Sequence, residues 1–256
     1  MTDAEKKMIT RANITTDGCD QSSSENVEKP PASLKSLFCR LYLLAFCIYI
    51  PAYNLIYYNL LNVVPFFLNK VLGAEPLLIS YLNISLCLLI AISTVAFSFL
   101  LLKVDQVLTW IQSRMVFTLV PMVLQIVFHI ALSTCVTVPG SVFILLLSAV
   151  AASTLFSGSV YTINYEIDPE NSAILVSVYN SFGQLSGFLG PILMVALTTT
   201  NPDIEDYDLV YRQKWSYFFY VVSGVAGIGF LAIVMAYLLK PDEWINRARE
   251  KRGLKV

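Results

Sequence analysis

The sequence predicts an all-α, polytopic membrane protein whose six transmembrane helices form one bundle. Hydrophobic residues make up 56% of the 256 residues and charged residues only 14%, whereas soluble domains contain about 25% charged residues. Mean hydropathy is +0.66. The apolar residues fall into runs long enough to cross a bilayer, which takes about 20 residues of helix. A transmembrane barrel would show alternating segments of about ten residues instead.

The elements follow in order along the chain. Residues 1–35 are polar and rich in Ser and acidic residues, so a disordered cytosolic tail is expected. Residues 36–240 form the predicted bundle, and residues 241–256 form a basic cytosolic tail. Proline inside the first, third and fifth spans predicts a kink in each, and the fifth helix is expected to be kinked or broken. The predicted spans are Leu37–Val64, Leu77–Leu102, Met115–Cys135, Val142–Tyr165, Ala173–Thr198 and Trp215–Leu239.

The distribution of basic residues predicts the orientation. Fourteen of the 17 Lys and Arg residues lie in the two tails or in the loop between the second and third spans, which includes Arg114. The other three, Lys70, Arg212 and Lys214, lie in loops on the opposite side. Basic loops stay in the cytosol, so both termini are expected there. The membrane is expected to be the plasma membrane or a vesicular or lysosomal membrane.

Several function classes find no support. The five cysteines are scattered without paired spacing, so neither a metal site nor a disulfide framework is expected. No nucleophile and base motif is present, so the chain is not expected to be an enzyme or to carry a cofactor. No basic patch indicates nucleic acid. The single histidine, His129, lies inside the third span, either as a proton relay or as a satisfied side chain between helices.

Polar residues inside the spans are the candidate functional residues, because polar groups in hydrocarbon usually face a protein interior or a wet cavity. Those of the first span recur at helical spacing and share a face. They either line a substrate cavity or form hydrogen bonds between helices. The fifth span adds polar residues among small ones, which allow close helix packing. The candidate cavity residues are Tyr53, Asn54, Tyr57, Tyr58, Asn180 and Gln184.

Three carboxylates lie between the fourth and fifth spans. Asp168 and Glu170 flank Pro169, which suits the first turn of a helix, where a carboxylate is favoured. Glu166 lies near the end of the preceding helix, where the helix dipole disfavours a carboxylate. A solvated turn therefore accounts for Asp168 and Glu170 better than for Glu166.

Three segments carry a family resemblance. Residues 163–191 resemble the motif "NHLDIAPRYAG-L-GISNG-GTLSG---P" of the solute carrier family 17 transporters, anion:cation symporters of the major facilitator superfamily. Residues 58–73, "YNLLNVVPFFLNKVLG", and 213–222, "QKWSYFFYVV", resemble segments after that family's seventh helix and at the entry to its last. The matches keep the family's order, so the chain is similar to the C-terminal half of such a transporter. The motif residues matched are Glu166, Ile167, Asn180, Gly183, Ser186 and Gly187.

The resemblance implies alternating-access transport of a small organic or inorganic anion, coupled to H⁺, Na⁺ or membrane potential. It also implies a gating or proton-linked role for Asn164 and Glu166, although Asn164 replaces the family histidine. Six helices stand where the family has twelve, so a second six-helix half or a homo-oligomer is an expected partner, beside the lipid bilayer. The chain is then a fragment, one half of an assembly, or a non-transporting half-carrier that binds full-length relatives.

Overall fold

The computed structural model describes residues 41–156, 160–167, 171–200, 206–239 and 246, and the regular structure in these ranges is helical throughout. This confirms the prediction of an all-α chain. Apart from residue 246, the predicted tails lie outside the described residues, as do Asp168 and Glu170. The described elements are α3 (Leu41–Tyr58), the π-helical turn η1 (Asn59–Val63), α4 (Val64–Lys70), α5 (Pro76–Val104), α6 (Trp110–Thr134), α7 (Val138–Phe156), α8 (Val160–Ile167), α9 (Ser172–Thr198) and α10 (Tyr207–Leu239).

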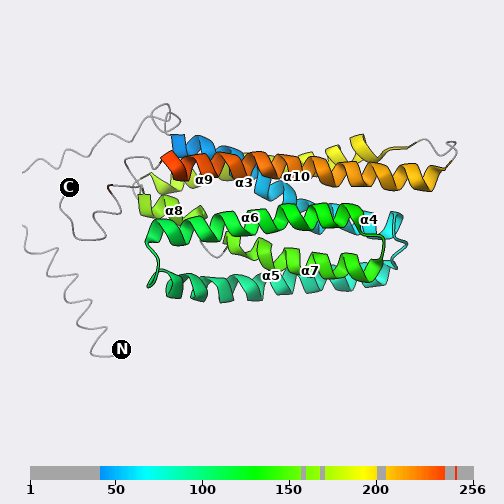
Figure 1. Cartoon of the computed structure of the whole chain (residues 1–256), viewed down its shortest axis with the longest axis horizontal. Coiled ribbons are helices and arrows are strands. Elements are labelled where there is room, and N and C mark those ends of the chain that lie inside the picture. Colours follow the sequence, from blue (N-terminus) through cyan, green and yellow to red (C-terminus); the bar gives the residue numbers. More distant parts are fainter. Residues whose placement is uncertain (1–40, 157–159, 168–170, 201–205, 240–245, 247–256) are drawn as a thin grey trace, which may run out of the picture. The chain divides into compact units, whose positions relative to one another are not determined.

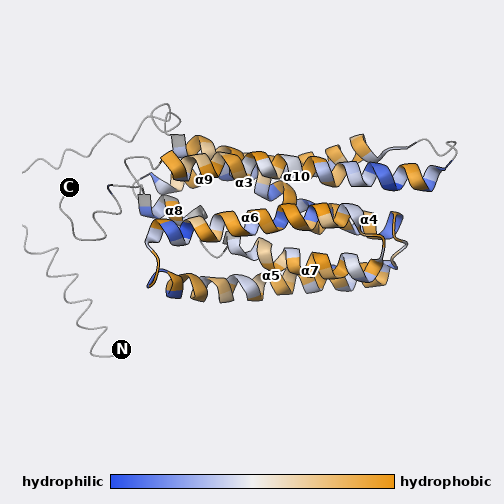
Figure 2. Ribbon diagram, in the orientation of Figure 1, coloured by the Kyte–Doolittle hydropathy of each residue, from blue (hydrophilic) through white to orange (hydrophobic). Residues whose placement is uncertain are grey.

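Most of the predicted spans correspond to long apolar helices. Five described segments are long and apolar enough to cross a bilayer: Tyr42–Lys70, Pro76–Val104, Trp110–Thr134, Ser172–Thr198 and Tyr207–Leu239. α7 is apolar but shorter, and the fourth predicted span is divided between α7 and α8. Figure 2 shows apolar residues along the helices and hydrophilic residues gathered toward their ends. These lengths and compositions are those of a polytopic membrane protein.

Proline affects these helices in two ways. Pro51, Pro121 and Pro191 lie inside α3, α6 and α9, and all three helices continue past them, so α9 is not broken. The first span changes geometry later, at η1, where the Val64 N–H bonds to the carbonyl of Asn59, five residues back. Pro65 follows at once, and its ring crowds the carbonyl four residues earlier. A wider π-helical turn relieves that crowding, and the sequence analysis did not predict it.

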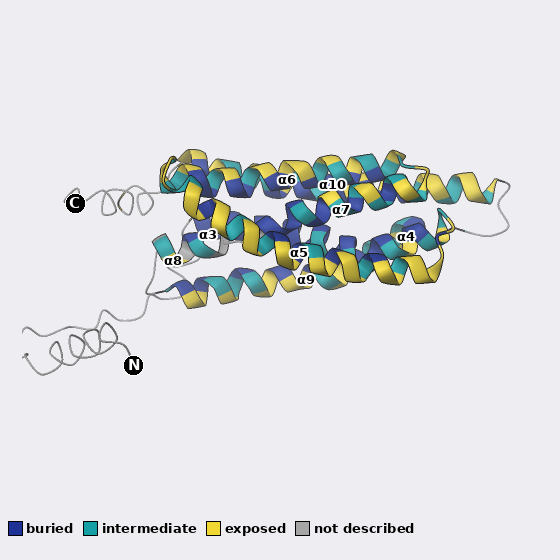
Figure 3. Ribbon diagram, turned by 90° about the horizontal axis from the view of Figure 1, so that it is seen from below, coloured by how far each residue is buried: buried dark blue, intermediate teal, exposed yellow. Residues whose placement is uncertain are grey.

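α3 lies at the centre of the packing. It packs against α9 and α10, α10 also packs against α6, and both α5 and α6 pack against α7 (Figure 1). In its most apolar window 67% of the residues of the α3 to α4 segment are buried, against 22% for α5 and for α9. Figure 3 shows the exposed residues that run along α5 and α9. The largest buried side chains include Tyr42, Phe46, Tyr49 and Tyr53 of α3 and Trp215, Phe218 and Phe219 of α10.

The helix order brings distant chain segments together at each end of the bundle. The turn between α5 and α6 lies at the same end as α8, and the turn between α4 and α5 lies at the other (Figure 1). That second turn contains Gly73, whose φ of +68° favours glycine. It is closed by Asn69, whose Nδ2 donates to the carbonyl of Ala74 at 3.1 Å. Charged residues buried at the first end form the candidate site.

Candidate functional site

The start of α6 places an arginine inside the bundle. Thr109 and Gln112 form a reciprocal cap: the Gln112 N–H donates to Thr109 Oγ1 at 3.4 Å, and the Thr109 N–H donates to Gln112 Oε1 at 3.1 Å. α6 therefore begins at Trp110, and Arg114 lies within it, only 5% exposed. The prediction that Arg114 lies in a loop and that the third span begins at Met115 was wrong. The signal missed was the spacing T-x-x-Q, which is typical of a helix start.

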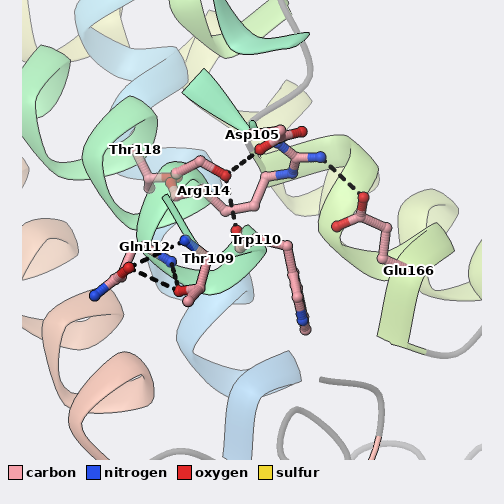
Figure 4. Close-up of polar contacts among 8 residues, drawn as sticks. Asp105, Thr109, Trp110, Gln112, Arg114, Thr118 and Glu166 are labelled. Carbon is pink, nitrogen blue, oxygen red and sulfur yellow. Dashed lines mark hydrogen bonds and ion pairs between the residues drawn. The ribbon is translucent and has the colours of Figure 1, made fainter. Parts of the chain in front are cut away.

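Arg114 joins two carboxylates from different elements. Its Nη1 lies 3.1 Å from each carboxylate oxygen of Asp105, and its Nη2 lies 2.8 Å from Glu166 Oε1. Figure 4 shows the guanidinium group between the two acids. Asp105 directly follows α5 and also accepts a hydrogen bond from the Ser113 hydroxyl, and Glu166 lies in the last turn of α8. We call Asp105, Arg114 and Glu166 the charge cluster.

The electrostatics of the charge cluster explain the position of Glu166. The side chains of Arg114, Asp105 and Glu166 are 7%, 28% and 19% exposed, so water screens these charges only in part. A buried ion is costly unless it is paired, and a carboxylate at the C-terminal end of a helix meets an unfavourable dipole. Arg114 compensates both effects for Glu166. Two carboxylates share one cation, so the cluster keeps an excess of acidic groups.

Buried hydroxyl groups connect the charge cluster to the core. Thr118 Oγ1 donates to the carbonyl of Arg114 at 2.7 Å and lies 3.3 Å from the hydroxyl of Tyr237 on α10. The hydroxyl of Tyr49 on α3 donates to the carbonyl of Thr118 at 3.3 Å. The turn of α6 that carries Arg114 is thereby attached to both α3 and α10.

The polar residues of α3 pack against the small residues of α9. A Cβ on Gly183 would lie 2.5 Å from Asn54 Nδ2, and a Cβ on Gly190 would lie 3.0 Å from Asn59 Oδ1. Only glycine fits at such distances. Between them Ser186 Oγ donates to the carbonyl of Pro51 at 2.7 Å. We call this packing of α9 on α3 the glycine contact.

The predicted cavity residues divide into two groups. Asn54, Tyr58 and Gln184 come together at the glycine contact, where the Tyr58 hydroxyl donates to Gln184 Oε1 at 2.6 Å. Asn180 lies one helical turn before Gln184 and is half-buried, whereas Gln184 is exposed.

Tyr53 belongs elsewhere: it is buried, and its hydroxyl lies 2.8 Å from the carbonyl of Ala152 on α7. Tyr57 is half-buried, with its ring centroid 5.7 Å from that of Tyr58. A substrate-binding role for any of these residues stays a prediction.

Two further predicted residues lie on α8 and α6. Asn164 lies on α8, but its side chain is outside the described residues. His129 is fully buried, and its Nδ1 lies 2.9 Å from the carbonyl of Gln125. Gln125 in turn exchanges two hydrogen bonds with Ser148 of α7. This contact favours a satisfied histidine between helices over a proton relay. The described residues contain no group of His, Cys, Asp and Glu that could hold a metal ion.

Sequence reasoning missed Asp105, Arg114 and Asn59 because their importance depends on which helices meet. No known family model matches the chain, and no curated protein matches it. The resemblance to the family 17 solute carriers therefore rests on the sequence motifs alone. What the helices themselves establish is a polytopic α-helical membrane protein with a buried charge cluster at one end of its bundle.

Proposed function

We propose that the chain is the C-terminal six-helix half of a secondary transporter for small anions, which works by alternating access. The observation that carries this proposal is the charge cluster. Ionisable groups inside membrane proteins are expensive and usually serve a function. Arg114 joins the end of α5 to the end of α8 through two ion pairs of 3.1 and 2.8 Å. Such a contact closes one end of a bundle and can be broken as a unit.

The uncovered faces of α5 and α9 support the same proposal. Both helices are apolar, yet in each only 22% of the residues in its most apolar window are buried. α9 also exposes Ser177, Ser181 and Gln184 at helical spacing. Exposed polar groups in a transmembrane helix are unfavourable against lipid. A second six-helix half, with a water-filled path between the halves, would cover the apolar residues and hydrate the polar ones.

A polar hollow at the opposite end of the bundle favours an anionic substrate. It has a volume of about 480 Å³, and its lining includes Lys70, Arg212 and Asp208. Neither cation has an ion pair among the residues that the structure describes. The basic residues of the loops and tails place the charge cluster in the cytosol and this hollow outside it. Two cations at the outer end would attract anions before they enter.

Uptake by purified protein tests the proposal. Proteoliposomes that contain the chain, alone and together with a separately expressed N-terminal half of a family 17 carrier, are supplied with labelled phosphate, glutamate, sialic acid or a nucleotide. Accumulation of at least one anion above protein-free liposomes is expected when both halves are present. No uptake of any of these anions, by a preparation that reconstitutes as well as an active full-length carrier, would contradict transport.

Glu166→Gln tests the role of the charge cluster in that uptake. The amide keeps the shape of the side chain but removes its charge, as protonation would. We expect the variant to lose the part of the pH dependence of uptake that Glu166 supplies, so that its uptake varies less with pH. Gln184→Glu serves as a control, because it changes charge on α9 outside the cluster. An unchanged pH profile in a correctly inserted Glu166→Gln protein would return Glu166 to a structural role.

A non-transporting half-carrier is the second candidate function. The uncovered faces of α5 and α9 favour it equally, because a chain that binds a full-length relative needs such faces. Co-purification with a full-length carrier, together with a changed uptake rate of that carrier, would support this candidate. Uptake by the chain and an N-terminal half, with no effect on a full-length carrier, would support transport.

A further inference from the structure

Asn59 is the least satisfied polar side chain of the membrane-spanning helices. It is fully buried, and neither Oδ1 nor Nδ2 has a hydrogen-bond partner among the residues that the structure describes. A buried polar atom without a partner costs about 1–3 kcal/mol, so such an atom in a native protein demands an explanation. Packing does not require an amide here, because a leucine of similar size would avoid the loss. The amide therefore indicates a ligand.

Asn59 stands at the one described place where the backbone of a span is irregular. It opens the π-helical turn η1, directly before Pro65. π-helical turns occur often at functional sites. The carbonyl of Leu61 cannot receive the usual hydrogen bond from residue 65, because proline has no N–H. Irregular backbone of this kind supplies carbonyl oxygens to cations in transporters that have broken helices.

α9 brings a second backbone oxygen to the same place. Gly190 lies against Asn59, with the position of its missing Cβ only 3.0 Å from Asn59 Oδ1. Pro191 follows, so the carbonyl of Gly187 also lacks its usual donor. In a helix the carbonyl of a residue points toward the residues three and four positions later. The Gly187 carbonyl therefore points toward Gly190, the residue that Asn59 Oδ1 approaches.

The chemistry of these groups selects a small monovalent cation. The available ligands are neutral oxygens, and neither residues 50–64 nor residues 183–195 contain a charged residue. A divalent cation prefers carboxylate ligands, and an anion would find no positive charge. The full burial of Asn59 leaves room for a dehydrated ion of small radius only. We propose that Asn59, with the carbonyls that Pro65 and Pro191 release, forms a Na⁺ site between η1 and α9.

The proposed site adds a coupling ion to the proposed transporter, and only this coupling role rests on the proposed function. Na⁺ would link η1 of α3 to α9 across the glycine contact, so its arrival or departure would change how firmly the two helices hold together. Binding itself is independent of transport and is measurable on the purified chain.

Thermal unfolding of the full chain in detergent micelles tests the site. NaCl, LiCl, KCl and choline chloride are compared at equal concentration. A ligand that binds only the folded state raises the melting temperature, and we expect NaCl to raise it by about 2–4 °C over choline chloride. KCl should give little or no increase. Equal effects of NaCl and KCl, or no effect of NaCl, would overturn the site.

Three variants identify the residue responsible. Asn59→Leu should abolish the Na⁺ effect, and Asn59→Asp should reach its half-maximal effect at a lower NaCl concentration, because a carboxylate attracts the ion more strongly. Asn62→Leu is the matched control: it removes an exposed amide from the same π-helical turn and should keep the Na⁺ effect. A Na⁺ effect retained in Asn59→Leu would overturn the site. Should that variant fail to fold, an Asn59→Asp protein with unchanged Na⁺ dependence would overturn it equally.

The result separates this site from the proposed function. Stabilisation by Na⁺ without uptake of any anion supports the site and argues against transport. Uptake of an anion by a chain that Na⁺ does not stabilise supports transport and overturns the site.

Discussion

The charge cluster and the glycine contact hold helices together by opposite means. The charge cluster joins helix ends through a few strong, directional ion pairs that centre on one buried guanidinium group. The glycine contact joins α3 and α9 along their length, through small residues and scattered hydrogen bonds. One region depends on a single residue, whereas the other depends on a surface. Loss of Arg114 should therefore release its partners completely, whereas a change at one glycine should only loosen the contact.

The membrane sharpens this difference. Lipid tails are as apolar as the helices, so burial of apolar surface does not drive helix association there. Close approach at small residues and polar contacts must hold the helices instead. A strong contact at one end and a smooth contact along the side together would let helices rock about a closed end. This is the arrangement that alternating access needs.

Arg114→Met is the substitution with the largest expected effect. It leaves Asp105 and Glu166 partly buried without their shared cation, and removal of one partner from a buried ion pair costs about 3–5 kcal/mol. The free energy of unfolding, measured by titration with a denaturing detergent, should fall by that amount. Arg114→Met combined with Glu166→Gln should recover part of the loss, because one unpaired charge is gone. A loss below about 1 kcal/mol, the value typical of exposed pairs, would remove the contrast between the two regions.

Gly183→Ala tests the other region. Its new methyl group would lie 2.5 Å from Asn54 Nδ2 and 2.8 Å from Ile50 Cγ2, so α9 must move away from α3. Overpacking of this kind costs about 1–3 kcal/mol. Gly187→Ala is the matched control on the same helix, since its methyl group meets the Tyr58 ring at an ordinary 3.5 Å. Equal losses in the two variants would show that the close approach of the helices is not what holds them.

The helices and their order could be predicted from the sequence because each depends on its own residues. Long apolar runs specify transmembrane helices locally, and five of the six predicted spans correspond to such helices. The division of the fourth span between α7 and α8 and the π-helical turn at Asn59 were not predicted. Pro65 did carry a local signal for the π-helical turn, but the first span was taken to end at Val64, so the proline appeared to lie beyond the helix.

The candidate site was harder to predict because it depends on residues far apart in the chain. Glu166 was singled out since its position conflicts with the helix dipole, and that conflict is a local property. Its partner, Arg114, lies 52 residues earlier, and no pattern in one sequence pairs the two. Tyr53 illustrates the reverse case: its spacing suggested the same face as Tyr57, yet its hydroxyl bonds to the backbone of α7. A shared helical face does not decide which neighbour lies opposite.

Thr109→Ala should have a smaller effect, about 1 kcal/mol, because it removes the hydroxyl that caps α6. The cap also fixes where α6 begins and therefore where Arg114 points. Thr109→Ser, which keeps the hydroxyl, should lose much less. Unfolding free energies of Thr109→Ala, Arg114→Met and the double variant form a cycle, and a coupling near zero would show that the cap does not position the charge cluster.

Tyr58→Phe should have the smallest effect. It removes the hydrogen bond from the Tyr58 hydroxyl to Gln184 Oε1, which lies at 2.6 Å on the exposed side of the glycine contact. Hydrogen bonds between transmembrane helices contribute about 0.6 kcal/mol on average, because the freed groups find other partners. The ring stays, so its packing on Gly187 is unchanged.

The partner variant Gln184→Leu gives this prediction its control. It removes the acceptor of the same hydrogen bond, so the losses from Tyr58→Phe and Gln184→Leu should not add in the double variant. A single loss as large as that of Arg114→Met would mean that one bond, not a surface, holds α9 to α3. The glycine contact would then be a second lock like the charge cluster, and a smooth surface along which helices rock would have no basis.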